Sequence, residues 1–224
     1  MTSHSVSVII PTLREEGSIA ETIQSVIDAG ADEIIVADGG SEDQTIAVAR
    51  AAGVDQVVES SPGRGIQLAK GAEVASSEWL LFLHADNRLA VQCIDQIRQL
   101  DAEQIWGAFE QSIEATGWLY RWLETGNAAR VRWRQMPFGD QAIFVRRRVY
   151  HQVGGFPAIP LMEDVEFSRR LRKVGRALLL PGPVLVDARR WQRRGVVRQT
   201  ARNWTIQIAY RMGVSPDRLR AWYR

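Results

Sequence analysis

Apolar runs alternate with amphipathic stretches along the first 90 positions of this chain. Short runs rich in Val, Ile and Leu, each stopped by polar or turn-forming residues, predict strands at 6–10, 34–36, 56–58 and 79–83. Between them, apolar residues at helical spacing predict helices at 19–27, at 45–52 and after the turn at 62–65. Strands that alternate with helices are typical of a mostly parallel, doubly wound α/β sheet.

The alternation is less regular beyond residue 100. We expect strands at 106–113 and 142–145, and a strand over 177–186 that Pro181-Gly182-Pro183 breaks. Helices are expected at 118–133, 165–174 and 201–212, with a last short one from Pro216, and Arg146-Arg147-Arg148 is interpreted as a basic turn. Because no linker or low-complexity stretch separates the parts, we expect one domain over 1–224, with halves 1–100 and 101–224.

Composition places the chain among ordinary globular proteins. It has 224 residues, of which 46% are hydrophobic and 24% charged. A single cysteine, Cys93, excludes an internal disulfide and a multi-cysteine metal site, and its helical apolar neighbours indicate a core position. We see no signal peptide and no apolar window of the roughly 18 residues that a membrane span needs, so we expect a cytoplasmic protein.

The formal net charge of +2 hides a strong asymmetry. Residues 1–120 carry 19 acidic and 6 basic side chains, whereas residues 121–224 carry 7 acidic and 22 basic ones, nearly all Arg. A basic half suggests nucleic acid, an anionic membrane or a phosphate-bearing ligand. The alternative is that the two halves neutralise each other across an internal or subunit interface.

Polar residues follow three of the predicted strands. The run at 79–83 stops at His84-Ala85-Asp86, the first strand leads into Pro11-Thr12-Leu13-Arg14-Glu15-Glu16, and the second into Asp38-Gly39-Gly40-Ser41-Glu42-Asp43. In an open parallel sheet these ends meet at the edge where ligands bind. A carboxylate there can hold a hard cation, and Arg64 at a helix N-terminus suits an anion. The edge therefore suits a nucleotide.

Each of these motifs also has a purely structural interpretation. The segment after the 79–83 run could be a plain polar turn, Thr12 or Glu16 could cap the next helix, and Ser41 or Asp43 could cap the helix after the second strand. Glu163 and Asp164 open a helix, where acids stabilise the helix dipole; the functional alternative is a general base.

Taken in this order, the motifs resemble glycosyltransferase family 2, the inverting enzymes of the GT-A fold. The resemblance runs from Val6 to about Trp191. It includes the Pro-Thr-x-x-Glu-Glu opening, the Asp-Gly-Gly-Ser-Glu-Asp turn, His84-Ala85-Asp86 at the place of the Asp-x-Asp metal motif, and Glu163-Asp164 at the place of the base. The Phe-Leu-His-Ala-Asp and Gly-Asp-Gln-Ala-Ile-Phe forms are similar to a bacterial subgroup with this His-Ala-Asp variant.

The resemblance implies a GT-A type, Rossmann-like sheet with C-terminal helices, and an inverting, hexosyltransferase-like activity. The donor would be a nucleoside-diphosphate sugar bound by the 1–100 half, and the acceptor would be bound by the 101–224 half. Donor contacts would come from Pro11, Thr12, Glu15, Asp38, Arg64, His84 and Asp86. Asp86, with His84, would hold Mn²⁺ or Mg²⁺, and Asp164, beside Glu163, would deprotonate the acceptor hydroxyl.

Three positions depart from the family pattern. His84 stands where a carboxylate is usual. As a metal ligand it would lower the negative charge at the metal and suit Mn²⁺ better than Mg²⁺. Alternatively, it contacts the sugar or ribose and leaves the metal to Asp86. Gly39 stands where a second Asp is usual and removes one ribose contact. Arg190 and Trp191 resemble the Arg-Trp of processive members, but Asp187 replaces their Gln.

The acceptor side is the least defined part of the sequence. We place Asp140 and Gln141 there, the alternative being a β-turn, together with Arg190 and Trp191. The aromatic residues of the 118–133 helix either stack on sugars, rest on a membrane or, as is commoner, pack on the core. The Arg-rich C-terminal segment is expected to contact the inner membrane face, where lipid-linked acceptors lie, or a second copy of the chain, and we expect no nucleic-acid partner.

Two other functions compete with sugar transfer. A sugar nucleotidyltransferase would share the sheet and the metal acid, but it usually has a Gly-rich loop with Arg and Lys after the first strand, which 11–17 lacks. A non-catalytic nucleotide-binding or membrane-adaptor protein is suggested by His84, Gly39 and the Arg-rich half. Neither the sugar nor the acceptor is predicted by the sequence.

Overall fold

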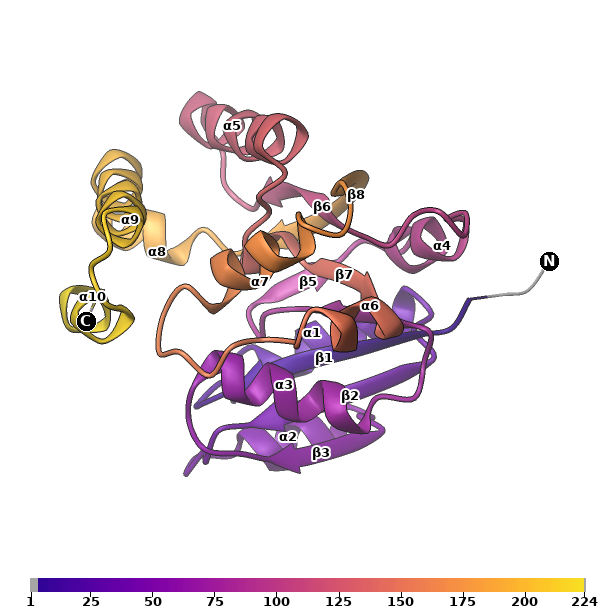
Figure 1. Cartoon of the computed structure of the whole chain (residues 1–224). Helices are drawn as coiled ribbons and strands as arrows, with labels where there is room; N and C mark the ends of the chain where they lie inside the picture. Colours follow the sequence, from indigo (N-terminus) through magenta and orange to yellow (C-terminus); the bar gives the residue numbers. More distant parts are fainter. Residues whose placement is uncertain (1–3, 224) are drawn as a thin grey trace.

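An eight-stranded mixed sheet forms the centre of the molecule (Figure 1). The structure, a computed structural model, describes residues 4–223, apart from the side chains of Arg190 and Tyr223. The strand order is β3-β2-β1-β4-β7-β6-β8-β5. The strands are β1 (Val6–Thr12), β2 (Glu33–Asp38), β3 (Gln56–Glu59), β4 (Trp79–Phe82), β5 (Asn87–Leu89), β6 (Trp106–Ile113), β7 (Ile143–Arg146) and β8 (Leu178–Val186).

Most of the strand pairings are parallel. The β3-β2, β2-β1, β1-β4 and β6-β8 pairs are parallel, and the pairs that join β7 to β4 and β6, and β5 to β8, are antiparallel. This confirms the α/β fold with a mostly parallel sheet. Thr12 is in register with Asp38, so the polar ends of β1 and β2 lie together at the carboxyl edge.

Helices cover both faces of the sheet. They are α1 (Ile19–Asp28), α2 (Thr45–Ala51), α3 (Arg64–Val74), α4 (Cys93–Arg98), α5 (Trp118–Arg134), α6 (Arg147–Gln152), α7 (Glu163–Leu171), α8 (Arg189–Arg194), α9 (Val196–Arg211) and α10 (Pro216–Tyr223), with a short 3₁₀ turn η1 (Gly139–Gln141). The apolar sides of α1, α2 and α4 pack on one face, and those of α3, α6 and α7 on the other.

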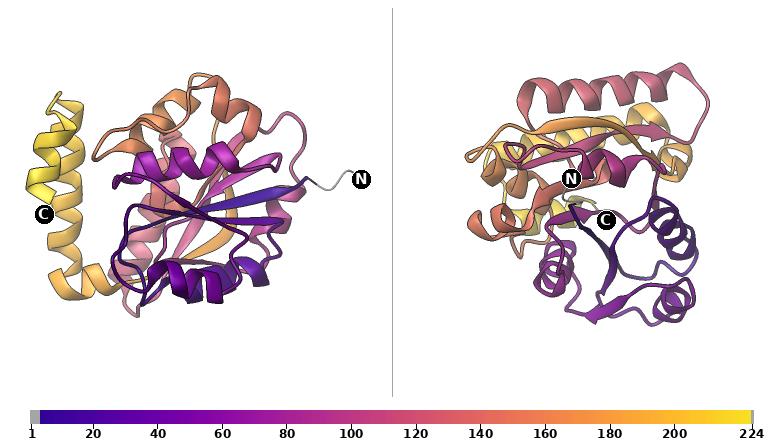
Figure 2. Two further views of the ribbon diagram at one scale, coloured as in Figure 1. Left: turned by 90° about the horizontal axis from the view of Figure 1, so that it is seen from below. Right: turned by 90° about the vertical axis from the view of Figure 1, so that its right-hand side faces the viewer.

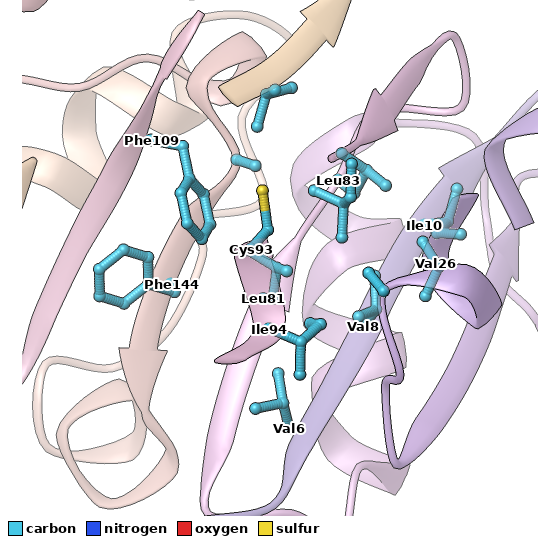
Figure 3. Close-up of a cluster of buried hydrophobic side chains, with 14 of the residues drawn as sticks. Val6, Val8, Ile10, Val26, Leu81, Leu83, Cys93, Ile94, Phe109 and Phe144 are labelled. Atoms are coloured by element: carbon cyan, nitrogen blue, oxygen red, sulfur yellow. The ribbon is translucent and has the colours of Figure 1, made fainter. Parts of the chain in front are cut away.

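The core follows from the two-residue period of the strands. Val6, Val8 and Ile10 of β1 join one apolar cluster, whereas Ile9 between them joins the other. Figure 3 shows the first cluster, in which Cys93 packs beside Leu81 and Phe109; Cys93 is therefore a core residue, as predicted. Burial raises the pKa of the Cys93 thiol to about 12.

Several local predictions from the sequence were wrong. The Arg146–Arg148 stretch is not a turn: Arg146 ends β7 with a buried side chain, and α6 begins at Arg147. The guanidinium of Arg146 pairs with Glu78, lies 4.5 Å from the ring of Trp79 and donates to two backbone carbonyls, which makes its burial tolerable. Pro181–Pro183 do not break β8. The pairing of β8 with β6 shifts register between Phe109 and Gln111, which accommodates these residues within the strand. The short elements β5 and α8 were not predicted.

The aromatic side of α5 faces solvent. Trp118, Trp122 and Trp133 are 74%, 55% and 86% exposed, so the core-packing interpretation was wrong for these three. Leu123, Ala128 and Val131 instead form the buried side of the helix. Figure 2 shows α9 and α10 side by side at one end of the molecule, away from the sheet. Within residues 4–223, no helix has the length and apolar character needed to cross a bilayer.

Candidate functional site

Asp38 fixes the turn that follows β2. Its carboxylate accepts hydrogen bonds from the hydroxyls of Thr12 (2.9 Å) and Ser41 (2.6 Å) and from the backbone N–H groups of Gly40 (2.9 Å) and Ser41 (2.7 Å). The side chain is fully buried. Its oxygens are thus satisfied within the protein, and the geometry supports a structural role for Asp38 rather than the base contact expected from the sequence.

Gln67 occupies the space beside Gly39. A Cβ at Gly39 would lie 3.1 Å from Gln67 Cδ and 3.2 Å from Pro62 Cα, so no side chain fits there without movement. The Gln67 amide donates to the carbonyls of Thr12 (2.6 Å) and Ala37 (3.1 Å) and so ties α3 to the ends of β1 and β2. Gly39 and Gln67 therefore form one close contact at this turn.

The start of α1 differs from the sequence alternatives, whereas the start of α2 agrees with one of them. Neither Thr12 nor Glu16 caps α1; Glu16 instead accepts from the N–H of Gln44, at the start of α2 (2.9 Å). Asp43 accepts from the N–H of Thr45, as the cap interpretation predicted (3.1 Å). The loop after β1 is therefore fastened to the loop after β2.

Two pockets adjoin at the carboxyl edge of the sheet. The first, here the Pro11 pocket, lies between the ends of β1 and α3 and is closed by the 158–161 loop and by Asp217 and Arg220 of α10. The second, here the His84 pocket, lies between the end of β4, the start of α7 and one side of α9. Arg64, Leu161 and Glu163 line both, so a ligand that spans the pockets passes these residues.

Arg64 and Glu163 form an ion pair at the junction of the pockets. Arg64 NH1 lies 3.1 Å from Glu163 Oε1, and the Glu163 side chain is only 2% exposed. Burial raises the pKa of the Glu163 carboxyl above its ordinary value, an effect that the charge of Arg64 partly offsets and the charge of Asp164 increases. The pair joins the start of α3 to the start of α7.

Asp164 is held by the backbone. Gly139 N–H donates to its Oδ2 (2.7 Å), and the N–H of Val165 donates to its Oδ1 (2.7 Å). A Cβ at Gly139 would lie 2.6 Å from His84 Nε2 and 3.5 Å from Asp164 Oδ2. Gly139 thus lets the end of β4 approach the start of α7, and brings His84 and Asp164 to the same wall of the His84 pocket.

The η1 turn is supported from behind. Asn87 and Gln111 both donate to the carbonyl of Asp140, at 3.2 and 3.1 Å, and Arg130 donates to Gln141 Oε1 (2.6 Å). The guanidinium of Arg130 lies 3.5 Å from the centroid of the Phe138 ring. Burial lowers the pKa of Arg130 to about 10, although Asp140 and Asp164 act in the opposite direction.

His84 and Asp86, the predicted metal ligands, fit a cation that is also coordinated by a bound substrate. His84 and Asp86 both line the His84 pocket and are half-buried. The described residues contain no group of three or more His, Cys, Asp or Glu side chains that could hold a metal ion alone. Mg²⁺ commonly binds through one or two carboxylates together with substrate phosphates and water, and this donor set fits that pattern.

The far wall of the His84 pocket comes from the C-terminal helices. Trp191 of α8 and four residues of α9 (Gln199, Asn203, Ile206 and Gln207) line it. Asp187 also faces the pocket and pairs with Arg189, whose Nε lies 2.5 Å from Asp187 Oδ2. The side chain of Arg190, which was predicted beside Trp191, lies outside the described residues.

The predicted site residues fall into two groups with two exceptions. Pro11, Thr12, Glu15 and Arg64 line the Pro11 pocket, and His84, Asp86, Asp140, Glu163, Asp164 and Trp191 line the His84 pocket. Asp38 and Gln141 line neither, because both are buried in hydrogen-bonded turns. Gly139 belongs to the Gly-Asp-Gln segment that was placed on the acceptor side, but its contact with Asp164 was not predicted. Gln67 and Gln199 were missed; no local pattern in the sequence marks them, since their roles depend on contacts with distant segments.

Comparison with known proteins identifies the family. Residues 7–159 match the model of the family described as "Glycosyl transferase family 2". A glucosyl-3-phosphoglycerate synthase of Mycolicibacterium smegmatis is 36% identical in an alignment of length 92 that covers 36% of this chain and 30% of that protein. A PGL/p-HBAD biosynthesis glycosyltransferase of Mycobacterium bovis is 26% identical in an alignment of length 168 that covers 67% of this chain and 62% of that protein.

Solved structures share the fold. The glucosyl-3-phosphoglycerate synthase of Mycobacterium tuberculosis, in complex with Mg²⁺ and UDP, superposes with a TM-score of 0.60 at 18% identity, covering 82% of this chain and 70% of that one. TarS 1–349 of S. aureus superposes with a TM-score of 0.64 at 18% identity, covering 82% of this chain and 60% of that one. The chain spans about a third of the length of the first curated relatives that it matches. Its family match over 7–159 and its GT-A-like architecture agree, and the chain belongs to glycosyl transferase family 2.

Proposed function

We propose that this protein transfers a sugar from a nucleoside-diphosphate sugar to an acceptor hydroxyl, with inversion at the anomeric carbon. The main support for the proposal is that the Pro11 pocket and the His84 pocket meet at shared residues. Arg64 and Glu163 line both, and Asp164 opens the same helix on the acceptor side. Membership of the family and the UDP complex of the M. tuberculosis synthase support a nucleotide donor.

The donor nucleoside is assigned to the Pro11 pocket. Pro11 and Thr12 form its floor at the end of β1, Glu15 lies on the following loop, and Arg64 stands where the two pockets meet. A diphosphate placed at that junction would meet the Arg64 guanidinium and the N-terminus of α3, both of which favour an anion. In this arrangement Asp38 does not contact the nucleoside and instead holds the turn after β2 in place.

A divalent cation, Mg²⁺ or Mn²⁺, would be held by Asp86 with oxygens of the diphosphate, and His84 stands beside it. When bound, such a cation neutralises charge that develops on the leaving diphosphate. The complexes of the M. tuberculosis synthase with Mg²⁺ and with Mn²⁺ support the use of a divalent cation.

Asp164 is proposed as the general base. It accepts the proton of the acceptor hydroxyl while the hydroxyl oxygen bonds to the anomeric carbon and the bond from that carbon to the diphosphate breaks on the opposite side. The hydrogen bonds from Gly139 and Val165 use one lone pair of each Asp164 oxygen and fix the carboxylate, so a further lone pair can meet the acceptor.

The test separates donor binding from transfer. UDP and GDP are titrated calorimetrically with and without Mn²⁺, and we expect at least one of them to bind more tightly with the metal. Asp164→Asn should lower transfer, or donor hydrolysis where no acceptor is known, by about 10²–10⁴-fold and leave nucleotide affinity within about twofold. Asp95→Asn on the exposed side of α4 is the matched control and should change neither.

Two results would contradict the proposal. Absence of UDP and GDP binding under every metal condition would remove the donor site. Loss of nucleotide affinity in Asp164→Asn, with its activity otherwise intact, would show that Asp164 belongs to donor binding and not to proton transfer.

A further inference from the structure

On the wall of the His84 pocket that the C-terminal helices form, two buried polar atoms have no hydrogen-bond partner among the described residues. They are the indole N–H of Trp191, a donor, and Oε1 of Gln199, an acceptor. Gln199 is only 3% exposed, and both residues line the pocket. Buried polar atoms are nearly always satisfied, and an exception inside a pocket points to a ligand group that completes it.

The orientation of Gln199 is set within α9. Its amide nitrogen donates to Asn203 Oδ1 at 2.9 Å, one helical turn further along. This contact leaves the amide oxygen as the end that accepts from a ligand. Hydroxyl groups both donate and accept, so a polyhydroxyl ligand can serve Gln199 Oε1 and Trp191 Nε1 together.

The lining charges of the pocket disfavour an anionic acceptor, although Arg189 pairs with Asp187 and Arg130 acts on Asp140 and Asp164 from behind the lining. Its described lining residues include five carboxylates, those of Asp86, Asp140, Glu163, Asp164 and Asp187, and one guanidinium, that of Arg64. That guanidinium is bound to Glu163 and stands at the donor side. Phosphates and carboxylates are usually recognised by Arg or Lys side chains, which the acceptor side of the described lining does not offer.

Part of the same wall is apolar. Ile206 of α9 and Val186 at the end of β8 line the pocket, and both are buried. Together with the indole of Trp191 they offer a surface for the apolar face of a sugar ring or of an aglycone.

We infer that the His84 pocket binds an acceptor that carries hydroxyl groups and no negative charge, with Gln199 and Trp191 as its hydrogen-bonding residues. The inference rests on the proposed function and adds the class of acceptor. Gln199 becomes an acceptor-binding residue contributed by the C-terminal helix α9, beyond the residues 7–159 that match the family model.

The first experiment compares three probes on protein saturated with UDP and Mn²⁺. Phenyl β-D-glucoside is neutral, glucosamine is cationic and 3-phosphoglycerate is anionic. We expect the first two to bind by calorimetry and the third to bind at least about tenfold more weakly. Equal or tighter binding of 3-phosphoglycerate, or failure of both phenyl β-D-glucoside and glucosamine to bind, would overturn the inference.

The second experiment removes the hydrogen-bond acceptor of Gln199, its Oε1 atom. Gln199→Met retains the length of the side chain and should weaken phenyl β-D-glucoside binding by about tenfold or more, while UDP affinity stays within about twofold. Gln192→Met, on the exposed side of α8, is the matched control. An unchanged glucoside affinity in Gln199→Met would overturn the role of Gln199, whereas a parent protein that does not bind UDP would overturn the proposed function instead.

Discussion

Glu163 carries a buried charge whose effect depends on pH. The folded protein holds the proton of this carboxyl more tightly than the unfolded chain does, because burial raises its pKa from 4.5. Ionisation therefore costs folding free energy. That cost is absent below the unfolded pKa and grows as pH rises through the folded pKa.

Glu163→Gln is expected to remove this cost. Measured by urea unfolding, parent and variant should have similar stability at about pH 4, and the variant should become the more stable one as pH rises towards 7. Groups remote from Glu163 titrate alike in both proteins and cancel in the difference, whereas Asp164, whose charge acts on Glu163, contributes to it. A parent that is more stable than the variant at pH 7 would show that the attraction of Arg64 outweighs burial.

The sequence predicted the positions of the acidic site residues, but it did not predict the contacts that hold them in place. Asp86, Glu163 and Asp164 could be placed at the site because strand ends and helix starts are local features. Gln67 could not, and the contact of Gly139 with Asp164 was not foreseen, because each acts on a segment more than 20 residues away in the chain. The burial of Asp38 follows from Thr12, Gly40 and Ser41 closing around it, and only a three-dimensional arrangement shows that closure.

Helices α3 and α5 differ in how closely they pack. A Cβ at Gly71 of α3 would lie 2.5 Å from Cγ2 of Ile9 in β1, whereas nothing lies within 4 Å of a Cβ at Gly126 of α5. Gly71 thus lets α3 lie close to the sheet, and Gly126 has no packing role in the described structure.

The same substitution should have opposite effects at these two positions. Gly71→Ala should lower the free energy of unfolding by about 1–3 kcal/mol through overpacking. Gly126→Ala should raise it by about 0.5–1 kcal/mol, because Ala loses less backbone freedom in a helix. Urea unfolding measures both, and destabilisation by Gly126→Ala would mean that this side of α5 is covered in solution.

Elements with strong periodicity were predicted to within a few residues. The misses have physical causes. β5 has three residues, too few for a pattern; the Arg residues at 146–148 masked the start of α6; and Pro181–Pro183 suggested a break that the neighbouring strand β6 accommodates.

Few ion pairs join the acidic and the basic parts of the chain directly. Among those of the described residues, two join an Arg of residues 121–224 to an acid of residues 1–120, Arg146–Glu78 and Arg132–Glu110, and Arg64–Glu163 joins the parts in the opposite sense. Arg198 and Arg211 of α9 remain exposed, on either side of a stripe formed by Val197, Trp204, Ile208 and Met212. Helical spacing places these four apolar side chains on one face, opposite the face that lines the His84 pocket.

This surface of α9 is expected to bind anionic vesicles. Phosphatidylglycerol vesicles should co-sediment the protein at low salt, and phosphatidylcholine vesicles should not, because Arg supplies attraction and Trp suits the interface. Trp204→Ser combined with Ile208→Ser should abolish binding, with Val91→Ser, which is 63% exposed on another surface, as control. A stable dimer that buries the same stripe would contradict this prediction and support the contact between copies.

The fit of Gln67 against Gly39 also limits how this sequence can diverge. Two positions 28 residues apart share one volume, so a side chain at 39 requires the end of Gln67 and the backbone at Pro62 to give way by a few tenths of an ångström. Replacement of Gln67 would in turn release the carbonyls of Thr12 and Ala37 at the ends of β1 and β2. Natural variation at the two sites should therefore be correlated.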